Sequence, residues 1–427
     1  MRIWTTVMGQ RLDDAADTRS MILCDHLLRR GHQVTMWTSA WDHIRKRWRD
    51  EWAASGGRPI QREDGLKIRF MKGVGYRRNT SPLRLVDHWR AADDFARQAE
   101  TLPPPDAIVA SLPDHVTAAA AVRIGRRLGA ATIIDVRDKW PDVIADFSAR
   151  SAAGQVARRL MHFEHRRTRK ALADADAVVA MMNSMMDWAM AKAGRRPGPL
   201  EQIFYLTTAP KTFGAPGPAL PYGHPVRAAL EASAGKVVFA FTGTFNRTQH
   251  PELLLTALED LKRRGSPVLD QAAFLIGGDG QDAEAVRRRA AAFVNVHCVG
   301  WLKPDEMRAL LAGSDVGLLL MNYPTEAFNN KAFSYLAAGL PIISGARGDL
   351  FDLIADHGIG INVPGGDAAA LADAIVRLTE DAPRREAMRD AARRLFDARF
   401  DRERNYSAYA DHIERVAASK ASRRAAA

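Results

Sequence analysis

The sequence is poor in cysteine and has no long apolar run. Only Cys24 and Cys298 occur in 427 residues, which excludes a disulfide framework and any cysteine-based metal motif. No stretch approaches the roughly 18 apolar residues that a membrane-spanning helix needs, and the start of the chain lacks the apolar block of a signal peptide. We therefore expect a cytoplasmic protein without membrane-spanning helices.

Acidic residues are too few to balance the basic ones in one half of the chain. Residues 1–200 hold 34 Lys and Arg against 23 Asp and Glu, whereas residues 201–427 hold 27 of each, so the excess of +11 lies in the first half. Such a surface suits an anionic partner, either nucleic acid or the inner membrane leaflet, although it also serves general solubility. Trp and Arg at helical spacing in residues 41–89 suit both partners. Because no helix-turn-helix, zinc or RNA-recognition pattern accompanies them, we favour the membrane and expect no nucleic acid.

The chain is too long for one ordinary hydrophobic core and suits two domains of about 200 residues. It opens as a βαβ unit, with a strand over residues 2–7, a helix over 18–30 and a strand over 33–38. The loop between the first two elements holds one glycine and lacks a dinucleotide fingerprint. These patterns predict an α/β fold with parallel sheets in both halves.

A segment rich in Pro and Gly separates the two halves. Residues 207–224 contain four Pro and three Gly and little apolar content, which is typical of an interdomain linker. We predict a first domain over 1–206, a second over 225–398, a C-terminal helix over 399–418 that returns to the first domain, and a disordered tail over 419–427.

The strongest functional signal lies in residues 322–345. An apolar strand leads into a loop with a single acid, Glu326, and Asn329 or Asn330 is placed to cap the helix that follows. The free N–H groups of a helix that starts at the carboxyl end of a parallel strand bind anions, and Lys331 adds a positive charge in the first turn. These groups predict a phosphate ligand.

Two glycine turns in the second half belong to the same predicted site. A strand over residues 236–242 is followed by Gly243, Thr244 and Arg247, and a later strand runs into Gly278. Glycine lets the backbone come close to a ligand, and an arginine in such a loop reaches a diphosphate.

Three passages resemble the retaining, two-domain glycosyltransferases of family 4, in the branch that builds bacterial surface polysaccharides. They are residues 19–39, Asp135-Val-Arg-Asp-Lys-Trp-Pro-Asp142 and Asn330-Lys-Ala-Phe-Ser-Tyr-Leu-Ala-Ala-Gly339. The resemblance implies the GT-B fold, with two facing Rossmann-like domains of which the first binds the acceptor and the second a nucleotide-sugar. It also implies a site in which Glu326 holds the donor sugar while Arg247 and Lys331 hold the diphosphate. No metal or other cofactor is expected.

One residue departs from the pattern of this family. Its members carry a second acid at the position of Ser334, and that acid accepts hydrogen bonds from the ribose of the nucleotide. Serine can bond a hydroxyl but brings no charge.

Polar residues that follow two strands of the first half complete the predicted site. His115 closes one cluster and Asp138 lies in another, and polar groups just past parallel strands face the ligand crevice. His115 and Asp138 are therefore candidates for contact with the acceptor hydroxyl or the transferred sugar. The alternative is a local ion-pair network of Asp135, Arg137 and Asp138.

Together these observations predict a transferase that moves a hexose or aminosugar from a nucleoside-diphosphate sugar to a glycan acceptor, lipid-linked and destined for O-antigen or capsule. We place it on the cytoplasmic face of the membrane, as a peripheral protein. Two alternatives remain open at this stage. One is a catalytically inactive subunit that binds nucleotide-sugar or membrane, which Ser334 favours, and the other is a sugar-nucleotide 2-epimerase.

Overall fold

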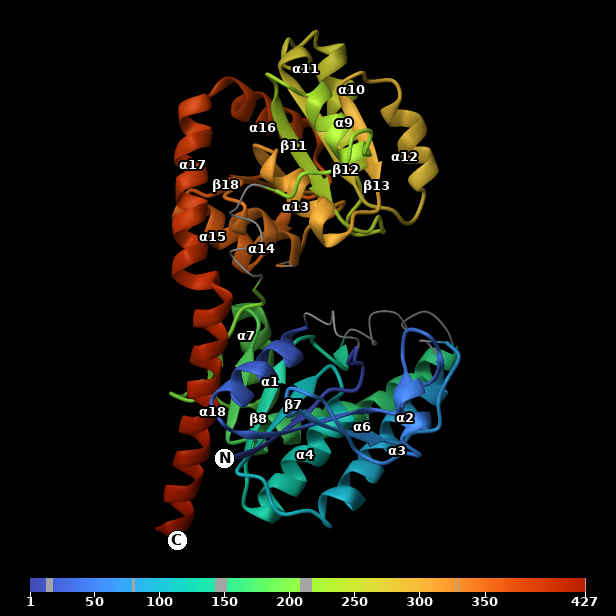
Figure 1. The fold of residues 1–427 in the computed structure, drawn as a ribbon, viewed down its shortest axis with the longest axis vertical. Helices are drawn as coiled ribbons and strands as arrows, with labels where there is room; N and C mark the ends of the chain where they lie inside the picture. The colour runs from blue at the N-terminus through green and yellow to red at the C-terminus, as the bar shows by residue number, and fades with distance from the viewer. Residues whose placement is uncertain are drawn as a thin grey trace. The chain divides into compact units, whose positions relative to one another are not determined.

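The computed structural model describes residues 1–12, 18–78, 81–142, 152–207, 217–326, 328 and 330–426, of which residues 152–160 are described by their backbone alone (Figure 1). The chain forms two compact units, Met1–Tyr205 with Tyr406–Ala427 (unit 1) and Leu206–Asn405 (unit 2). The sequence predicts that the first domain ends at residue 206 and that the C-terminal helix begins at residue 399. Residues 208–216 of the predicted linker lie outside the described residues.

Unit 1 is built on a sheet in which the described strands pair in parallel, except that β5 pairs antiparallel with β6. The strand order is β10-β9-β8-β7-β1-β2-β6-β5, so the direction of winding reverses between β1 and β7. The strands are β1 (Arg2–Thr6), β2 (Gln33–Ser39), β5 (Ile60–Gln61), β6 (Lys67–Met71), β7 (Ala107–Leu112), β8 (Ala131–Val136), β9 (Ala177–Ala180) and β10 (Gln202–Ile203).

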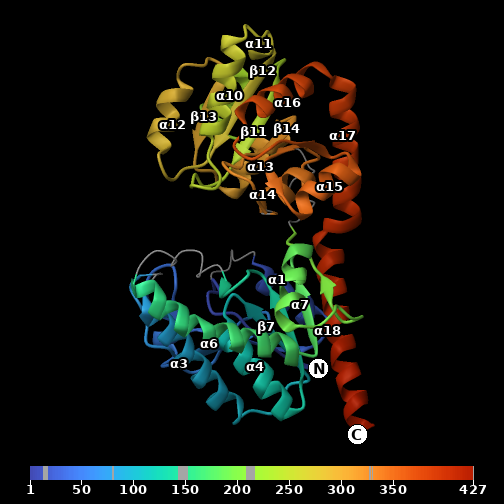
Figure 2. The ribbon, with the colours of Figure 1, turned by 180° about the vertical axis from the view of Figure 1, so that it is seen from behind.

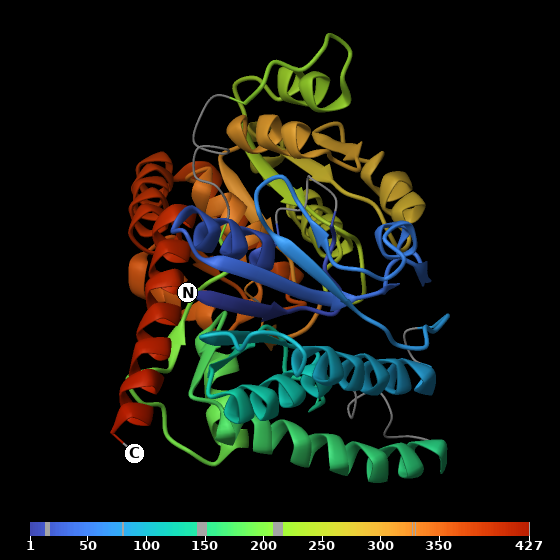
Figure 3. The same ribbon diagram turned by 60° about the horizontal axis from the view of Figure 1, so that its bottom comes forward.

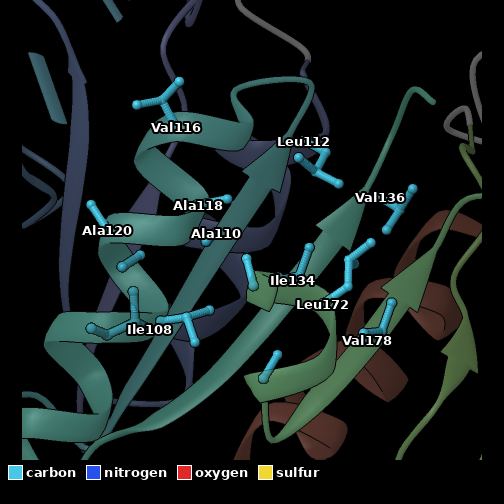
Figure 4. Close-up of a cluster of buried hydrophobic side chains, with 14 of the residues drawn as sticks. Ile108, Ala110, Leu112, Val116, Ala118, Ala120, Ile134, Val136, Leu172 and Val178 are labelled. Carbon is cyan, nitrogen blue, oxygen red and sulfur yellow. The ribbon is translucent and has the colours of Figure 1, made fainter. Parts of the chain in front are cut away.

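Helices cover the sheet of unit 1 because its central strands are apolar on both faces. All six residues of β7 and of β8 are buried, as expected for strands inside a parallel sheet. In Figure 4, Ala118 of α4 lies beside Ala110 of β7, in the same apolar cluster as Ile108 of β7 and Ile134 of β8. The helices are α1 (Arg19–Arg29), α2 (Asp50–Ala54), α3 (Pro82–Ala99), α4 (His115–Leu128), α6 (Ala152–Asp174) and α7 (Asn183–Ala193).

The segment rich in Trp and Arg forms a hairpin where the sequence predicted helical spacing. Strands β3 (Trp41–Asp42) and β4 (Arg47–Trp48) pair antiparallel, and Asp42 caps the turn by accepting hydrogen bonds from the backbone N–H groups of Ile44 and Arg45. The ring of Trp41 packs edge-on against that of Trp48, with their centroids 5.2 Å apart. The expectation of helical spacing is therefore wrong for residues 41–48, where a cross-strand ring pair replaces a helical face, whereas α2 and the first part of α3 are helical within residues 41–89.

Unit 2 contains a sheet whose described strands pair in parallel, in the order β13-β12-β11-β14-β16-β18. Its direction of winding reverses between β11 and β14. The strands are β11 (Val237–Thr242), β12 (Ala272–Gly277), β13 (Val296–Gly300), β14 (Val316–Leu319), β16 (Ile342–Ser344) and β18 (Gly360–Asn362), and β15 (Thr325–Glu326) pairs separately with β17 (Ala346–Arg347).

Amphipathic helices pack on this sheet, and α10 and α16 lie side by side on one face (Figure 2). Buried leucines of α10, such as Leu254 and Leu258, join the core with Phe239 and Phe274 of the sheet. The helices are α9 (Pro225–Ala232), α10 (Glu252–Arg263), α11 (Val268–Gln271), α12 (Ala283–Ala290), α13 (Pro304–Ala312), α14 (Asn330–Ala337), α15 (Asp349–His357), α16 (Ala368–Glu380) and α17 (Ala382–Leu395), which runs into the π-helix η1 (Phe396–Phe400).

The last helix, α18 (Arg402–Ala425), continues where the sequence predicted a disordered tail over 419–427. Its end is anchored in unit 1 because Lys420 and Arg423 both pair with Asp176, at 3.0 and 3.1 Å. Figure 3 shows α18 running beside β10. Arg415 of α18 donates a hydrogen bond to the side-chain carbonyl of Gln202 in β10. The prediction of disorder is therefore wrong, because these two ion pairs hold a segment of low apolar content. No helix in the described part of the chain has both the length and the apolarity to cross a bilayer.

Candidate functional site

The loops that follow β11 and β14 flank the point where the winding of the unit 2 sheet reverses, which is where open α/β sheets bind ligands. Hydrogen bonds join these two loops. The amide of Asn322 donates to the carbonyl of Thr248 over 2.9 Å, and its side chain donates to the carbonyl of Arg247 over 3.1 Å. The hydroxyl groups of Thr248 and Tyr323 lie 2.7 Å apart. The predicted residues of both loops therefore belong to one edge of the sheet.

Two of the predicted glycines lie at this edge of the sheet, where they form a floor of closely packed backbone below the two loops. Gly243 and Gly278 have φ angles of +136° and +147°, which other residues rarely adopt. A Cβ added to Gly278 would lie 1.9 Å from the carbonyl oxygen of Gly243, so the two turns are in backbone contact. Between them, the amide of Gly243 donates to the carbonyl of Gly277 over 2.9 Å. Only glycine fits at position 278.

Helix α14 is held under this floor by Tyr335, which the sequence did not identify. The buried hydroxyl of Tyr335 accepts a hydrogen bond from the amide of Thr242 over 3.0 Å and donates to the carbonyl of Leu318 over 3.3 Å. Burial raises the pKa of Tyr335 to about 12, so the hydroxyl keeps its proton. Because residues four apart share a helix face, Tyr335 also sets the direction of Lys331.

The Lys331 ammonium is buried and makes no hydrogen bond within the described residues. Its Nζ lies 4.5 Å from the centroid of the Phe241 ring, and a Cβ added to Gly243 would lie 2.6 Å from it. Burial lowers the pKa of Lys331 from 10.5 to about 8. A buried charge without a counter-ion is costly, so the arrangement is suited to an anion that approaches the backbone at Gly243.

Three other residues predicted to bind the nucleotide-sugar are exposed, namely Thr244, Arg247 and Glu326. Arg247 forms no ion pair with any described residue. Glu326 is exposed in β15, and its Cγ lies 3.5 Å from the Cβ position of Gly348, the residue that caps α15. Glu326 therefore lies beside the start of a second helix.

The helix start at Asn330 agrees with the predicted cap region, whereas Asn329 lies outside the described residues. Ser334 is buried, and its hydroxyl donates to the carbonyl of Asn330 over 3.2 Å. This bond occupies the proton of the Ser334 hydroxyl within the helix. A ribose hydroxyl at this position would meet an acceptor oxygen and no negative charge.

In unit 1, His115 lies inside the protein instead of at an open surface. Its Nε2 lies 2.7 Å from Oε2 of Glu164, and both side chains are almost fully buried. Glu164 also accepts hydrogen bonds from Trp89 and Arg167, at 3.2 and 2.8 Å. Burial opposes the ionisation of Glu164, but the bond from His115 and the charge of Arg167 hold its pKa below the ordinary value. His115 is thus part of a buried hydrogen-bond network, because α6 packs against α4 and places Glu164 beside the first residue of α4.

Asp138 lies outside the ion-pair network that its neighbours form. Asp135 is buried between Arg19 and Arg137, with contacts of 3.0 and 2.8 Å, which confirms the local network for Asp135 and Arg137. Asp138 accepts a hydrogen bond from the amide of Lys139 over 2.8 Å. Burial raises the pKa of Asp138. A role for Asp138 at the acceptor stays a prediction.

The sequence predicted that His115 would face a ligand crevice past the ends of the strands, but two polar residues near it do so instead. Ser111 and Asp114 line a cavity of about 260 Å³ past the carboxyl ends of β1, β2 and β7. The cluster 111–115 was visible in the sequence, but only the packing distinguishes which of its side chains meets the cavity. Among the described residues no group of three His, Cys, Asp or Glu side chains is placed to hold a metal ion.

Two doubly wound α/β units in one chain, with polar loops at the reversal point of each sheet, define the GT-B class of folds. Residues 15–205 match the family described as "Glycosyl transferase 4-like domain", and residues 236–381 match "Glycosyl transferases group 1". Together the two matches cover well over half of the sequence. The chain therefore belongs to the two-domain glycosyltransferases built from these families.

Comparison with individual proteins gives the same class. The D-inositol 3-phosphate glycosyltransferase of Corynebacterium diphtheriae is 29% identical over 161 residues, which are 36% of this chain and 37% of that protein. The match thus spans less than two fifths of the length of this curated relative. The crystal structure of Anabaena HepE in complex with UDP superposes with a TM-score of 0.68 at 14% identity, covering 97% of this chain and 100% of the other. Sucrose-phosphate synthase from Thermosynechococcus elongatus superposes with a TM-score of 0.65 at 18% identity, covering 98% and 99%.

Proposed function

We propose that the chain is a retaining glycosyltransferase whose unit 2 binds a nucleoside-diphosphate sugar. The observation that carries this proposal is the buried ammonium of Lys331, which has no hydrogen-bond partner among the described residues and lies against the glycine turn at the reversal point of the sheet. A buried cation without a counter-ion destabilises the folded protein, and a bound diphosphate would supply the missing negative charge.

The proposed chemistry needs positive charge at the leaving group. The bond between the anomeric carbon of the sugar and the diphosphate breaks more readily when the charge left on the diphosphate is stabilised. Lys331, Arg247 and the first N–H groups of α14 supply that stabilisation, and Glu326 binds the sugar hydroxyls. The acceptor oxygen then bonds to the anomeric carbon, and its proton passes to the leaving phosphate. We propose that no metal ion takes part, so activity persists in a chelator.

UDP is the first nucleotide to test, because the structure of Anabaena HepE that this chain resembles contains UDP. Ligand at a hundred times its dissociation constant adds about 2.7 kcal/mol of stability, which a thermal shift detects. We expect a shift with UDP in the wild type and a much smaller one in Lys331→Met. If no nucleoside diphosphate stabilises the protein, the proposal fails.

A second candidate is a catalytically inactive subunit, and Ser334 favours it because it replaces an acid with a hydroxyl that is bonded inside the helix. Radiolabelled UDP-sugars separate the two candidates. Transfer or slow hydrolysis by the wild type, lost in Glu326→Ala, supports the enzyme. Binding of UDP-sugars with neither reaction supports the inactive subunit.

We further propose that the acceptor is a lipid-linked glycan of surface-polysaccharide synthesis, reached from the inner face of the membrane. None of the three relatives named above supports this acceptor by name, so it rests on the sequence resemblance and on the surface of unit 1. Ile44 and Leu83 are exposed large apolar residues of unit 1, at 68% and 55%. Tyr76 contacts the segment of Ile44, since its hydroxyl lies 2.5 Å from Nδ1 of His43 and its ring lies 4.9 Å from Nζ of Lys46. It is also hydrogen-bonded to Arg84, the residue after Leu83.

Apolar side chains among basic ones suit the headgroup region of an anionic bilayer. We expect co-sedimentation with vesicles that contain anionic lipid, weakened by salt and by Ile44→Ser. The control is Val294→Ser, which changes an exposed apolar residue of unit 2. Binding that ignores both salt and Ile44 would contradict this face as the membrane contact.

A further inference from the structure

Unit 1 has its own reversal point, between β1 and β7, and a cavity lies there. The cavity has a volume of about 260 Å³ and is lined by residues that follow β1, β2 and β7, among them Met8, Trp41 and Ser111. At about 30 Å³ for each water molecule it has room for eight or nine waters, which suits a single sugar ring. We refer to it as the Asp114 cavity.

Several buried polar atoms at the Asp114 cavity form no hydrogen bond with the described residues. They are Oγ of Ser111, Oδ2 of Asp114, Nε1 of Trp41 and Nε of Arg84. A buried polar group without a partner destabilises the folded protein, so such groups together at a cavity indicate a ligand that bonds to them. They include an acceptor, a donor and a hydroxyl that serves as either.

The free oxygen of Asp114 determines the charge of that ligand. Oδ1 of Asp114 is occupied, since it accepts a hydrogen bond from the amide of Thr117 and lies 3.3 Å from Nδ1 of His88. Although burial opposes ionisation, the bonds from His88 and Thr117 hold the pKa of Asp114 below its ordinary value, so Oδ2 is an anionic acceptor. It attracts the hydroxyl groups of a ligand and repels a phosphate or carboxylate.

Two arginines line the Asp114 cavity, and each also contacts other groups of the protein. Arg137 is bonded to Asp135 and to Ser20, at 2.9 and 2.8 Å. Arg84 lies over the Trp140 ring, 4.7 Å from its centroid.

Aromatic rings complete the wall. The Trp41 and Tyr76 centroids are 6.2 Å apart, and the Trp41 ring is fixed against Gly75, where an added Cβ would lie 2.7 Å from it. A rigid aromatic ring beside hydrogen-bonding groups of both kinds matches a sugar ring, which has apolar C–H faces and a rim of hydroxyl groups.

We propose that the Asp114 cavity binds an uncharged monosaccharide unit of the acceptor. This inference rests on the proposed transferase function and specifies its acceptor, which would be a neutral sugar. In this respect the chain would differ from a transferase whose acceptor is a sugar or inositol phosphate. Asp114 and Ser111 receive and orient the sugar hydroxyls, and Trp41 packs on the ring.

Saturation-transfer NMR with the full chain and UDP tests this proposal. The probes are methyl glycosides of glucose, mannose, galactose and N-acetylglucosamine, each beside its 6-phosphate. We expect transfer to at least one neutral glycoside in preference to its phosphate. Asp114→Asn, which keeps a good helix cap, and Ser111→Ala should each weaken that binding about tenfold or more.

The matched control is Tyr409→Phe, since the hydroxyl of Tyr409 in unit 1 is also buried without a hydrogen-bond partner among the described residues but Tyr409 does not line the cavity. A preference for phosphates, equal binding by the Asp114 variant and the wild type, or no transfer to any glycoside would each overturn the proposal. The thermal shift with UDP on the same samples separates the two levels. A shift with UDP but no glycoside binding refutes only the cavity assignment, whereas no shift with UDP refutes the transferase function.

Discussion

Replacing Lys331 by methionine should make the protein more stable and worse at binding its donor. Methionine has a similar length and packs well on an aromatic ring such as that of Phe241. Burial lowers the pKa of Lys331 from 10.5 to about 8, and each pKa unit corresponds to about 1.4 kcal/mol. The charged lysine therefore costs the folded state about 3 kcal/mol at neutral pH, which the substitution should recover.

The pH dependence distinguishes this charge effect from better packing. Between pH 8 and 10.5 the unfolded chain binds more protons at Lys331 than the folded chain, so the stability of the wild type rises with pH in this window. The cost is complete below pH 8 and vanishes above 10.5. The advantage of Lys331→Met in free energy of unfolding should therefore be largest at pH 7 and close to zero at pH 10.5.

The unfolding of unit 2 can be followed separately, because Trp301 is the one tryptophan in Leu206–Asn405. In protein labelled with 5-fluorotryptophan, the ¹⁹F signal of Trp301 reports urea unfolding of unit 2 at each pH. The control is Lys262→Met at an exposed lysine of α10, which should change stability by less than about 0.5 kcal/mol. Destabilisation by Lys331→Met, or a gain in stability that does not change with pH, would refute the reasoning.

Three other substitutions test the frame of the site. Gly278→Ala should destabilise unit 2 by at least about 3 kcal/mol and abolish UDP binding, because its Cβ would overlap the Gly243 carbonyl. The control is Gly265→Ala, which lies in open space at φ +65° and should cost only about 1–2 kcal/mol. Equal effects of the two substitutions in urea unfolding would contradict the backbone contact. Tyr335→Phe should lower the free energy of unfolding by about 1–3 kcal/mol and weaken UDP binding in calorimetry, since two backbone groups lose their partner. Unchanged UDP affinity would show that α14 is positioned by other contacts. Glu164→Gln should cost about 3–5 kcal/mol at pH 7. Because the pKa of Glu164 is lowered, this contribution is complete above its ordinary value and is lost as pH falls below it, so the melting temperatures of wild type and variant should converge in acid; a gap that persists at low pH would exclude the charge.

The sequence was most informative where glycine and polar residues follow an apolar strand. Gly243 and Gly278 could be predicted as close-approach positions, since each ends a short apolar run and such turns favour residues without a Cβ. The βαβ opening and the helix at Asn330 follow from the same alternation of pattern. The loops at the reversal point of the unit 2 sheet were therefore foreseeable as a set.

Burial and pairing between distant segments could not be predicted in this way. His115 and Asp114 are adjacent in a polar cluster, and only the position of Glu164 on α6 determines that the histidine is enclosed while the aspartate meets the cavity. The missing partner of Lys331 likewise depends on Phe241 and Gly243, about 90 residues earlier in the chain. Local patterns give the type of residue at a site, whereas its charge balance is a property of the packed structure.

The two errors in the fold have a similar cause. The Trp and Arg segment after β2 forms a hairpin, because Trp41 and Trp48 pair across the strands. The predicted disordered tail remains helical because Asp176 holds two of its basic residues. In both segments a tertiary contact overrides the local composition.

The claim that Lys331 binds a diphosphate is tested most directly by comparing UDP with uridine in calorimetry, for the wild type and for Lys331→Met. Uridine keeps the base and ribose and lacks the diphosphate, so the ratio of the two affinities isolates the diphosphate contribution. Loss of one buried charged partner costs about 2–4 kcal/mol, or about 30- to 1000-fold in affinity. We predict that Lys331→Met loses this factor for UDP and binds uridine as the wild type does. Equal UDP affinity in the two proteins would contradict the account.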